Sequence, residues 1–188
     1  MRHTSPLRRI RADGFTFGTG LEPGMPWLRY LEILAKQQRG TGLPPGWVPG
    51  TFLVADVAGE LVGRSSIRHR LTDFLEREGG HIGYGVLPAY RRRGYATEIL
   101  RQSLVVARAI GIDRVLVACD DTNIGSIAVI EACGGRLDNV VESAAGGTRI
   151  RRYWIDRVVL PSGVPCLLSS GHPLAGRSGR ISVPARAG

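Results

Sequence analysis

One short segment, His81–Ala96, constrains the fold of this chain more than any other part of it. It reads HIGYGVLPAYRRRGYA, so an apolar run at Ile82–Val86 is followed at once by Pro88 and by three consecutive arginines. Proline cannot donate to a strand ladder, and from Ala96 onward apolar residues recur with helical spacing. The segment therefore predicts a strand, a tight turn and a helix whose first turn follows Arg91–Arg93.

Two glycines, Gly83 and Gly85, interrupt the predicted strand. Glycine inside a strand often marks a bulge, or a place where a ligand or another backbone comes close. We therefore expect an irregularity at Gly85, with functional groups gathered beside it.

The predicted helix start has the chemistry of a phosphate site. The first turn of a helix leaves backbone N–H groups without intrahelical partners and carries a partial positive charge. Gly94 leaves the backbone open to an anion, Ala96 is small, and Arg91–Arg93 add charge that can bind phosphate oxygens. These residues alone leave open whether the turn binds phosphate or is a solvated, arginine-rich turn.

The rest of the chain alternates between strand-like and helical patterns. They predict, in order, a helix over 26–40, strands over 51–57 and 60–68, a helical or irregular piece over 72–77, a strand over 114–119, a helix over 123–134, and strands over 136–143 and 148–157. In this mixed α/β layout, one crossover places the strands at Ile82 and Val115 parallel. We expect one domain over 25–160, an N-terminal segment over 1–24 and a flexible or extended tail over 161–188.

The charge of the chain raises nucleic acid as a partner, since the net charge is +9 and the pI is near 10.5. However, Lys36 is the one lysine among many arginines, and no helix-turn-helix, zinc-finger or aromatic RNA-binding motif accompanies them. We therefore expect no nucleic-acid partner. The sequence has no apolar run long enough to cross a bilayer and its start lacks the apolar core of a signal peptide, which favours a cytoplasmic protein with no membrane partner.

The cysteines agree with a reducing compartment. The chain has three of them, Cys119, Cys133 and Cys166, an odd number without metal-like spacing. We expect neither a disulfide framework nor a metal site.

At Arg91–Ala96 the sequence resembles a known family. The stretch fits the Arg/Gln-x-x-Gly-x-Gly/Ala signature with which the GNAT superfamily of N-acetyltransferases binds the pyrophosphate of acetyl-coenzyme A (acetyl-CoA). Asn123–Ser126, followed by Gly134–Gly135, resembles the family's Asn-x-x-Ser/Ala helix that ends in glycine. Further blocks resemble a bacterial subgroup of this family and lie at Gly46–Pro49, Ser66–Leu71, Gly79–Gly85, Cys119–Asn123 and Arg151–Ile155.

The resemblance implies the GNAT fold: a mixed, mostly antiparallel sheet with a splayed parallel strand pair and flanking helices. It implies that the backbone N–H of Val86, beside Gly85, holds the acetyl carbonyl of acetyl-CoA. It also implies that Asn123 and Ser126 face the pantetheine arm, with Ile130 close to the thioester sulfur. The residues it implies for the pyrophosphate are Arg91, Arg92, Arg93, Gly94, Tyr95, Ala96 and Thr97.

Two positions depart from the family pattern. Many members have a tyrosine where this chain has Ile130, and its hydroxyl can protonate the leaving thiolate; some members have a glutamate where this chain has Ala118. The remaining acid and base candidates are His81, Asp120 and His69, followed by Tyr84 and Glu78.

These candidates also have structural interpretations. An unperturbed histidine titrates near neutral pH, which favours His81 as a base, but His81 can equally cap the strand that it begins. Asp120 can equally cap the helix that follows it. Tyr84 fits the core or a pocket wall, because aromatic residues in strands usually pack.

We expect transfer of an acetyl group from acetyl-CoA to a primary amine of a small molecule or peptide, by direct attack of the amine. The missing tyrosine keeps open a second hypothesis, a catalytically silent acetyl-CoA-binding sensor or regulatory protein. Arg68 and Arg70 favour an acceptor that carries an acidic group. A homodimer is common in this fold and is one possible state of the protein.

Overall fold

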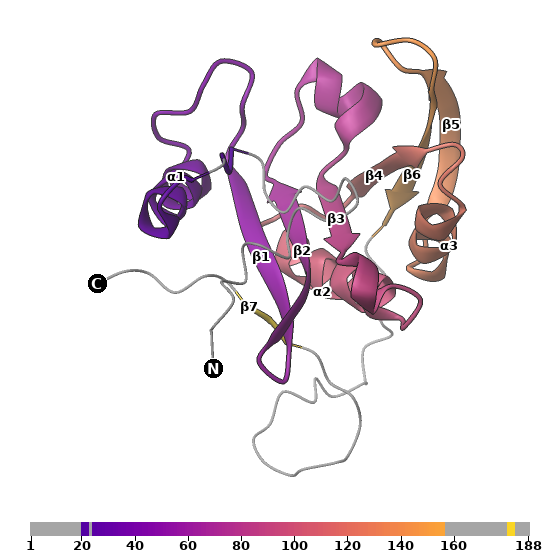
Figure 1. The fold of residues 1–188 in the computed structure, drawn as a ribbon. Helices are drawn as coiled ribbons and strands as arrows, with labels where there is room; N and C mark the ends of the chain where they lie inside the picture. Colours follow the sequence, from indigo (N-terminus) through magenta and orange to yellow (C-terminus); the bar gives the residue numbers. More distant parts are fainter. Residues whose placement is uncertain (1–19, 23, 157–179, 183–188) are drawn as a thin grey trace, which may run out of the picture.

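The computed structural model describes residues 20–22, 24–156 and 180–182, which form two antiparallel sheets flanked by helices (Figure 1). Most of the predicted N-terminal segment, most of the predicted tail and the last residue of the final predicted strand lie outside the described residues. Within the described part, no helix is long and apolar enough to span a membrane, and no three His, Cys, Asp or Glu side chains are grouped as metal ligands would be.

The first sheet has the strand order β3-β2-β1-β7, and each neighbouring pair is antiparallel. Its strands are β1 (Gly50–Val57), β2 (Glu60–Arg68), β3 (Ile82–Val86) and β7 (Arg180–Ser182). β1 and β2, the strands predicted over 51–57 and 60–68, form a hairpin that turns at Ala58 and Gly59 with φ angles of 54° and 83°. β7 pairs with β1, so three residues of the predicted tail form an extended strand.

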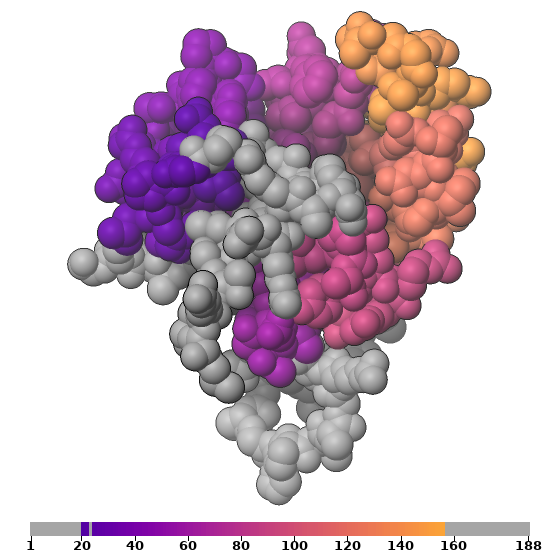
Figure 2. All heavy atoms as spheres, in the orientation of Figure 1, coloured from indigo at the N-terminus to yellow at the C-terminus, as the bar shows by residue number. Residues whose placement is uncertain are grey.

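The second sheet has the strand order β4-β6-β5, again antiparallel throughout. Its strands are β4 (Val115–Asp120), β5 (Arg136–Glu142) and β6 (Arg149–Ile155). The continuous apolar start of β4 is buried, as its composition predicts. In the space-filling view the β5–β6 hairpin and the region of α1 lie at opposite sides of the molecule (Figure 2).

Two helices cover opposite faces of the first sheet, because side chains alternate between faces along a strand. Ser65 of β2 is hydrogen bonded to Ser103 of α2 (Oγ–Oγ 2.8 Å). Phe52 of β1, which pairs with Ser66, instead packs edge-on against Tyr30 of α1. A third helix, α3, packs against α2 and β4. The helices are α1 (Trp27–Arg39), α2 (Tyr95–Ala109) and α3 (Ile124–Ala132).

Two short turns complete the described chain. The piece predicted as helical or irregular over 72–77 contains a π-helical turn at Leu75–Gly79. A 3-10 turn at Pro88–Tyr90 connects β3 to the arginine-rich segment, as the proline after the strand predicts.

The two sheets meet at His81, directly before β3. The His81 N–H donates to the Leu116 carbonyl oxygen of β4 (2.7 Å), and the Leu116 N–H donates to His81 Nδ1 (2.9 Å). From there β3 continues in its ladder with β2, and β4 continues in its ladder with β6. The predicted sheet with a splayed strand pair is therefore built as two antiparallel sheets joined at one end.

The bulge expected at Gly85 is not found. β2 and β3 pair in unbroken register from the Ile67/Ile82 pair to the Gly63/Val86 pair, and the register shifts of the described strands lie in β1 and β5. The close approach lies instead at Gly63 of β2, where a Cβ would lie 2.5 Å from the Gly85 carbonyl oxygen.

Gly80 leads into the joint in a backbone conformation that other residues avoid. Its φ of 63° and ψ of −177° lie in a region almost restricted to glycine, and a Cβ there would lie 2.7 Å from the Leu116 carbonyl oxygen. We predict that Gly80→Ala lowers the free energy of unfolding by about 2 kcal/mol or more, measured by urea unfolding. Gly125→Ala is the control, because a Cβ there meets Asn123 Oδ1 at an ordinary 3.6 Å. Equal losses in the two variants would contradict the prediction.

Protonation of His81 should weaken the joint. Burial, and secondarily the nearby Arg68 charge, lower the pKa of folded His81. The unfolded chain then binds the proton more readily, so stability is lost as the pH falls below about 6.5, the ordinary histidine pKa. His81→Asn keeps an acceptor for the Leu116 N–H but does not titrate. We predict that this variant loses less stability than the parent between about pH 7.5 and 5, measured by urea unfolding; identical pH profiles would refute this.

Candidate functional site

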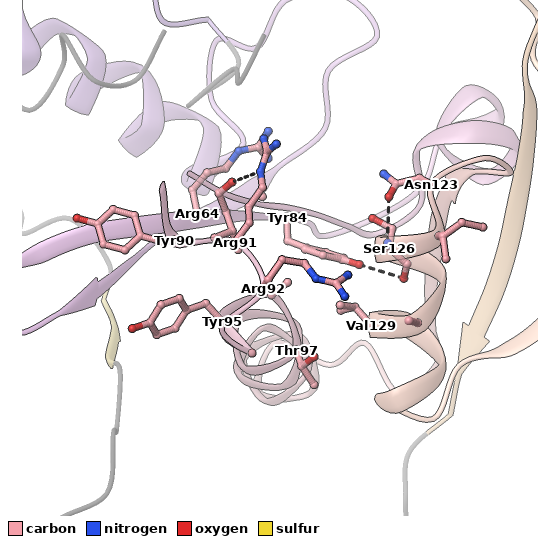
Figure 3. A pocket seen from close by; sticks show the side chains of 17 residues that line it. Arg64, Tyr84, Tyr90, Arg91, Arg92, Tyr95, Thr97, Asn123, Ser126 and Val129 are labelled. Carbon is pink, nitrogen blue, oxygen red and sulfur yellow. Dashed lines mark hydrogen bonds between the residues drawn. The ribbon is translucent and has the colours of Figure 1, made fainter. Parts of the chain in front are cut away.

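A cavity of about 1030 Å³ lies between β3, the start of α2 and one side of α3 (Figure 3). All the residues that the sequence predicts for the cofactor line it, except Arg93 and Ile130. The complete lining consists of Arg64, Tyr84, Gly85, Val86, Tyr90, Arg91, Arg92, Gly94, Tyr95, Ala96, Thr97, Asn123, Ile124, Gly125, Ser126, Ala128 and Val129.

The first turn of α2 forms one wall of this cavity. Gly94 is the N-cap in a left-handed conformation (φ 81°), and the Glu98 N–H makes a bond to the Gly94 carbonyl oxygen (3.2 Å). The N–H groups of residues 95–97 come before this first bond of the helix, so they have no partner within the helix. They lie at its positive end. Arg92 also has a left-handed backbone (φ 62°), and its side chain extends toward α3 (Figure 3). Such strain in a residue other than glycine is typical of functional sites.

The other two arginines of the turn make different contacts. Arg91 lines the cavity and donates from Nε to the Val86 carbonyl oxygen (3.2 Å), which ties the turn to the end of β3. The Arg93 guanidinium lies over the Tyr90 ring, 5.9 Å from its centroid. Consecutive arginines thus differ in what they can offer a ligand.

The start of α3 forms the opposite wall. Asn123 Oδ1 accepts a hydrogen bond from the Ser126 N–H (3.0 Å), which makes Asn123 the N-cap of the helix predicted from this position. The helical period then decides which side chains face the cavity: Ser126 and Val129 line it, whereas Ile130 is fully buried in the core. Ile130 therefore lies behind the wall rather than in the cavity lining.

The backbone of β3 directs the Val86 N–H toward this space. In an antiparallel ladder, successive N–H groups point alternately to the two sides of the strand. The Leu87 N–H points to β2, where it donates to the Val62 carbonyl oxygen (2.9 Å). The Val86 N–H therefore points away from β2, to the side on which β3 and β4 separate. A backbone N–H in this position can stabilise a negatively charged oxygen.

Tyr84 reaches across the cavity from β3 to α3. Its hydroxyl donates to the Ser126 carbonyl oxygen (3.4 Å; Figure 3). Burial raises the pKa of Tyr84 to about 12, so its hydroxyl is protonated near neutral pH and can donate a proton. Burial likewise raises the pKa of the Cys119 thiol to about 11.

The two histidines predicted as bases are engaged in structural contacts. His81 Nδ1 accepts the Leu116 N–H, so the neutral ring carries its proton on Nε2 and has no free lone pair there. His69 Nε2 is hydrogen bonded to Thr51 Oγ1 (2.9 Å). Both residues lie outside the cavity lining, and burial lowers the pKa of each.

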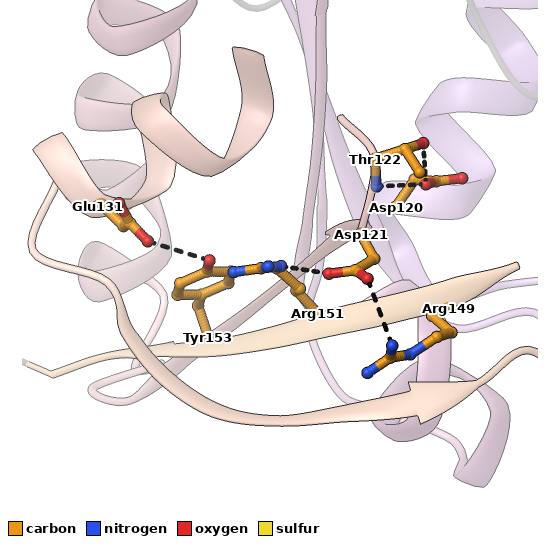
Figure 4. A network of polar contacts seen from close by, with 7 residues as sticks. All are labelled: Asp120, Asp121, Thr122, Glu131, Arg149, Arg151 and Tyr153. Carbon is orange, nitrogen blue, oxygen red and sulfur yellow. Dashed lines mark hydrogen bonds and ion pairs between the residues drawn. The ribbon is translucent and has the colours of Figure 1, made fainter. Parts of the chain in front are cut away.

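The acidic candidates are also hydrogen bonded. Asp120 accepts bonds from the Thr122 hydroxyl (2.6 Å) and N–H (2.9 Å), which lower its pKa (Figure 4). The Glu78 carboxylate accepts bonds from the Ala144 N–H and the Ser143 hydroxyl, which lower its pKa and tie the π-helical turn to the β5–β6 hairpin. Carboxylates with a lowered pKa are weak bases.

Sequence reasoning missed part of the lining. The α3 residues Gly125 and Val129 could have been found by continuing the helical period from the Asn123 cap. No pattern in the sequence around Arg64 indicates that it lines the cavity. Its position there depends on the pairing of β2 with β3, which places Arg64 opposite Gly85.

Comparisons with known proteins agree on one family. Over residues 22–134 the chain matches the acetyltransferase (GNAT) family. No curated protein matches the sequence. Among solved structures, the chain is similar to YncA, a putative acetyltransferase from Salmonella typhimurium with its cofactor acetyl-CoA, with a TM-score of 0.55 and 17% identity over 80% of this chain and 85% of that chain.

Two further structures are similar in the same way. A ribosomal-protein-alanine N-acetyltransferase from Brucella melitensis has a TM-score of 0.53 and 18% identity over 75% of this chain and 85% of that chain. An N-acetyltransferase from Staphylococcus aureus Mu50 has a TM-score of 0.52 and 18% identity over 68% of this chain and 74% of that chain. These structural likenesses concern the fold, whereas the family match covers more than half of the chain, and the protein therefore belongs to the acetyltransferase (GNAT) family.

Proposed function

We propose that this protein transfers an acetyl group from acetyl-CoA to a primary amine of a small molecule or peptide, by direct attack of the amine. The observation that carries the proposal is the cavity, which joins the start of α2, the Val86 side of β3 and the Asn123-capped start of α3 in one space. Membership of the acetyltransferase family and the likeness to the Salmonella protein that holds acetyl-CoA support it.

In this proposal each wall binds one part of acetyl-CoA. The N–H groups of 95–97 and the Arg92 guanidinium hold the pyrophosphate, because a helix N-terminus and an arginine both favour anions. The pantetheine arm lies along Asn123 and Ser126. The acetyl carbonyl then points to the Val86 N–H.

The reaction follows from this arrangement. The neutral amine attacks the carbonyl carbon, and the Val86 N–H stabilises the oxyanion of the tetrahedral intermediate. The intermediate collapses to the amide and expels the coenzyme A thiolate, while the nitrogen loses a proton to solvent. An acetyl-cysteine route is disfavoured because the thiolate is the nucleophile in such a route, and the pKa of Cys119, about 11, keeps it a thiol.

The proposal assigns protonation of the leaving thiolate to Tyr84. Its hydroxyl lies in the cavity at the Ser126 carbonyl, and burial keeps it protonated, so it can pass its proton to the sulfur as the C–S bond breaks. The phenolate then regains a proton from solvent. Tyr84 thus takes over the role of the tyrosine that many family members have at the position of Ile130.

A silent acetyl-CoA-binding sensor is the second candidate function. It is favoured by the structural hydrogen bonds of His81, His69 and Asp120, which engage the groups that could deprotonate an amine. Release of coenzyme A in the presence of amines separates the two functions, since a sensor binds acetyl-CoA without turnover.

Neighbouring arginines test the phosphate site. We predict that Arg92→Gln weakens acetyl-CoA binding about tenfold, because it removes a charged donor from the cavity. Arg93→Gln removes the same charge from the neighbouring residue, whose guanidinium lies over the Tyr90 ring outside the cavity lining. This variant should bind acetyl-CoA within about twofold of the parent affinity. Calorimetric titration gives both constants, and a thermal shift with acetyl-CoA confirms binding by the parent. Equal losses would overturn the assigned roles, and no binding by the folded parent would overturn the proposed function.

Two tyrosines of the cavity test the proton donor. We predict that Tyr84→Phe lowers kcat about 100-fold, with little change in acetyl-CoA affinity, because it removes the proposed acid. Tyr95→Phe removes a hydroxyl from another lining residue and should retain the activity of the parent. Both are measured as coenzyme A thiol release over a panel of primary amines. Full activity of Tyr84→Phe would exclude Tyr84 as the donor.

A further inference from the structure

Two arginines of β2, Arg64 and Arg68, lie together over the backbone of β3. They share one face of β2 with Ser66, and β3 places Gly83 and Gly85 on that same face. A Cβ on Gly83 would lie 3.6 Å from Arg68 Nη1 and 3.9 Å from Arg64 Nη1. Both guanidinium groups therefore converge on one glycine, whose missing side chain lets them lie against the strand.

Carbonyl oxygens hold this pair in place. Arg68 Nη1 donates to the carbonyl oxygens of Gly79 (3.1 Å) and Gly80 (3.2 Å), and Arg64 Nη1 donates to that of Gly83 (3.4 Å). The Gly79 and Gly80 carbonyl oxygens satisfy Arg68 Nη1 without neutralising the charge of Arg68. Burial lowers the pKa of Arg68, and the nearby Arg64 charge lowers it further. An anion between the two groups would offset both the desolvation and the mutual repulsion.

A buried hydroxyl of α1 interacts electrostatically with Arg64. The Tyr30 side chain is fully buried, and its hydroxyl has no hydrogen-bond partner among the described residues. Burial raises the pKa of Tyr30 to about 12, opposed by the charge of Arg64, so the hydroxyl is protonated near neutral pH. A buried hydroxyl without a partner is unfavourable, and a protonated one can donate to an anion.

This arrangement borders the proposed acetyl site. Arg64 lines the cavity and lies opposite Gly85 in the ladder, one residue from Val86. Arg68 lies further along β2, outside the cavity lining. It is next to the joint, because its N–H donates to the His81 carbonyl oxygen. An acceptor bound along this face could place its anionic end at the arginines and its amine at the acetyl group.

We propose that Arg64 and Arg68 form a binding site for an anionic group, a carboxylate or a phosphate, on the amine that accepts the acetyl group. This inference rests on the proposed function and names its substrate class: amines that carry a negative charge, rather than polyamines. It also corrects the sequence-based expectation for Arg68 and Arg70, since the structure pairs Arg68 with Arg64 and leaves Arg70 exposed.

Matched acceptors test the proposal on the full chain. Coenzyme A release is measured with O-phosphoethanolamine against ethanolamine for phosphate, and with β-alanine against β-alaninamide for carboxylate. The anionic member of at least one pair should have a kcat/KM about tenfold higher, and the pair that responds identifies the group. Equal or lower values for both anionic members would overturn the site while leaving the acetyltransferase function intact.

Variants of equal charge test the residues. Arg68→Gln should raise the KM of the preferred anionic amine about tenfold, with acetyl-CoA binding and the rate with neutral amines unchanged, and Arg68→Lys should restore part of the preference. Arg70→Gln, which removes the same charge from an exposed position, should behave like the parent. Equal effects at the two positions would mean that net charge acts rather than a site, and loss of activity with neutral amines as well would mean that Arg68 only supports the fold.

A binding measurement separates this inference from the proposed activity. The protein saturated with coenzyme A is melted in phosphate and in acetate, with chloride of the same ionic strength as reference. Phosphate or acetate should raise the melting temperature of the parent and of Arg70→Gln more than that of Arg68→Gln. If no amine is turned over and this pattern holds, the anion site stands and the transferase activity fails. If neither anion stabilises the parent beyond chloride, the anion site is refuted.

Discussion

The hydrogen bonds between His81 and Leu116 are the constraint on which the rest of the site depends. They tie the two sheets together at a single residue, through one backbone bond and one ring bond. Each of the adjoining strands is then paired in its own sheet, so β3 and β4 separate and leave a space that backbone does not fill. That separation leaves the Val86 N–H facing open space and lets Tyr84 reach across to α3. The bond that His81 Nδ1 accepts in the joint occupies the one basic nitrogen of the neutral ring, which makes this residue a poor base.

The charges of the molecule are distributed unevenly between the two sheets. On the second sheet, Asp121 pairs with Arg151 and Arg149 of β6, which offsets positive charge locally (Figure 4). On the cavity side, the start of α2, Arg92 and Arg64 add positive charge around one space. Acetyl-CoA is an anion, and a site of this sign raises both its affinity and its rate of encounter. A net charge of +9 is therefore consistent with small anionic ligands and does not require nucleic acid.

Local features of the site could be predicted from the sequence, and features that depend on distant pairing could not. The left-handed Gly94 before α2 and the Asn123 cap of α3 follow from residue types within a few positions of each other. By contrast, the contact of Arg64 with the cavity depends on strand register. The bulge expected at Gly85 was wrong because β2 pairs with β3 in unbroken register through this glycine. The structural bond of His81 was one of two interpretations that the sequence left open, and only the neighbouring strand decides between them.

The position of Ile130 shows why a proton donor would come from a strand rather than from α3. Ile130 is fully buried, and a Cβ on Gly135 would lie 2.5 Å from its Cγ2, so the space around it is already filled. A tyrosine at 130 would have to leave the core or displace this contact, which costs free energy in a close-packed interior. Tyr84 requires no such rearrangement of the core, because its side chain extends from β3 across the cavity to the Ser126 carbonyl oxygen. In the proposed mechanism, the leaving thiolate needs a protonated hydroxyl within reach. In a narrow space between a strand and a helix, either the strand or the helix can provide that hydroxyl.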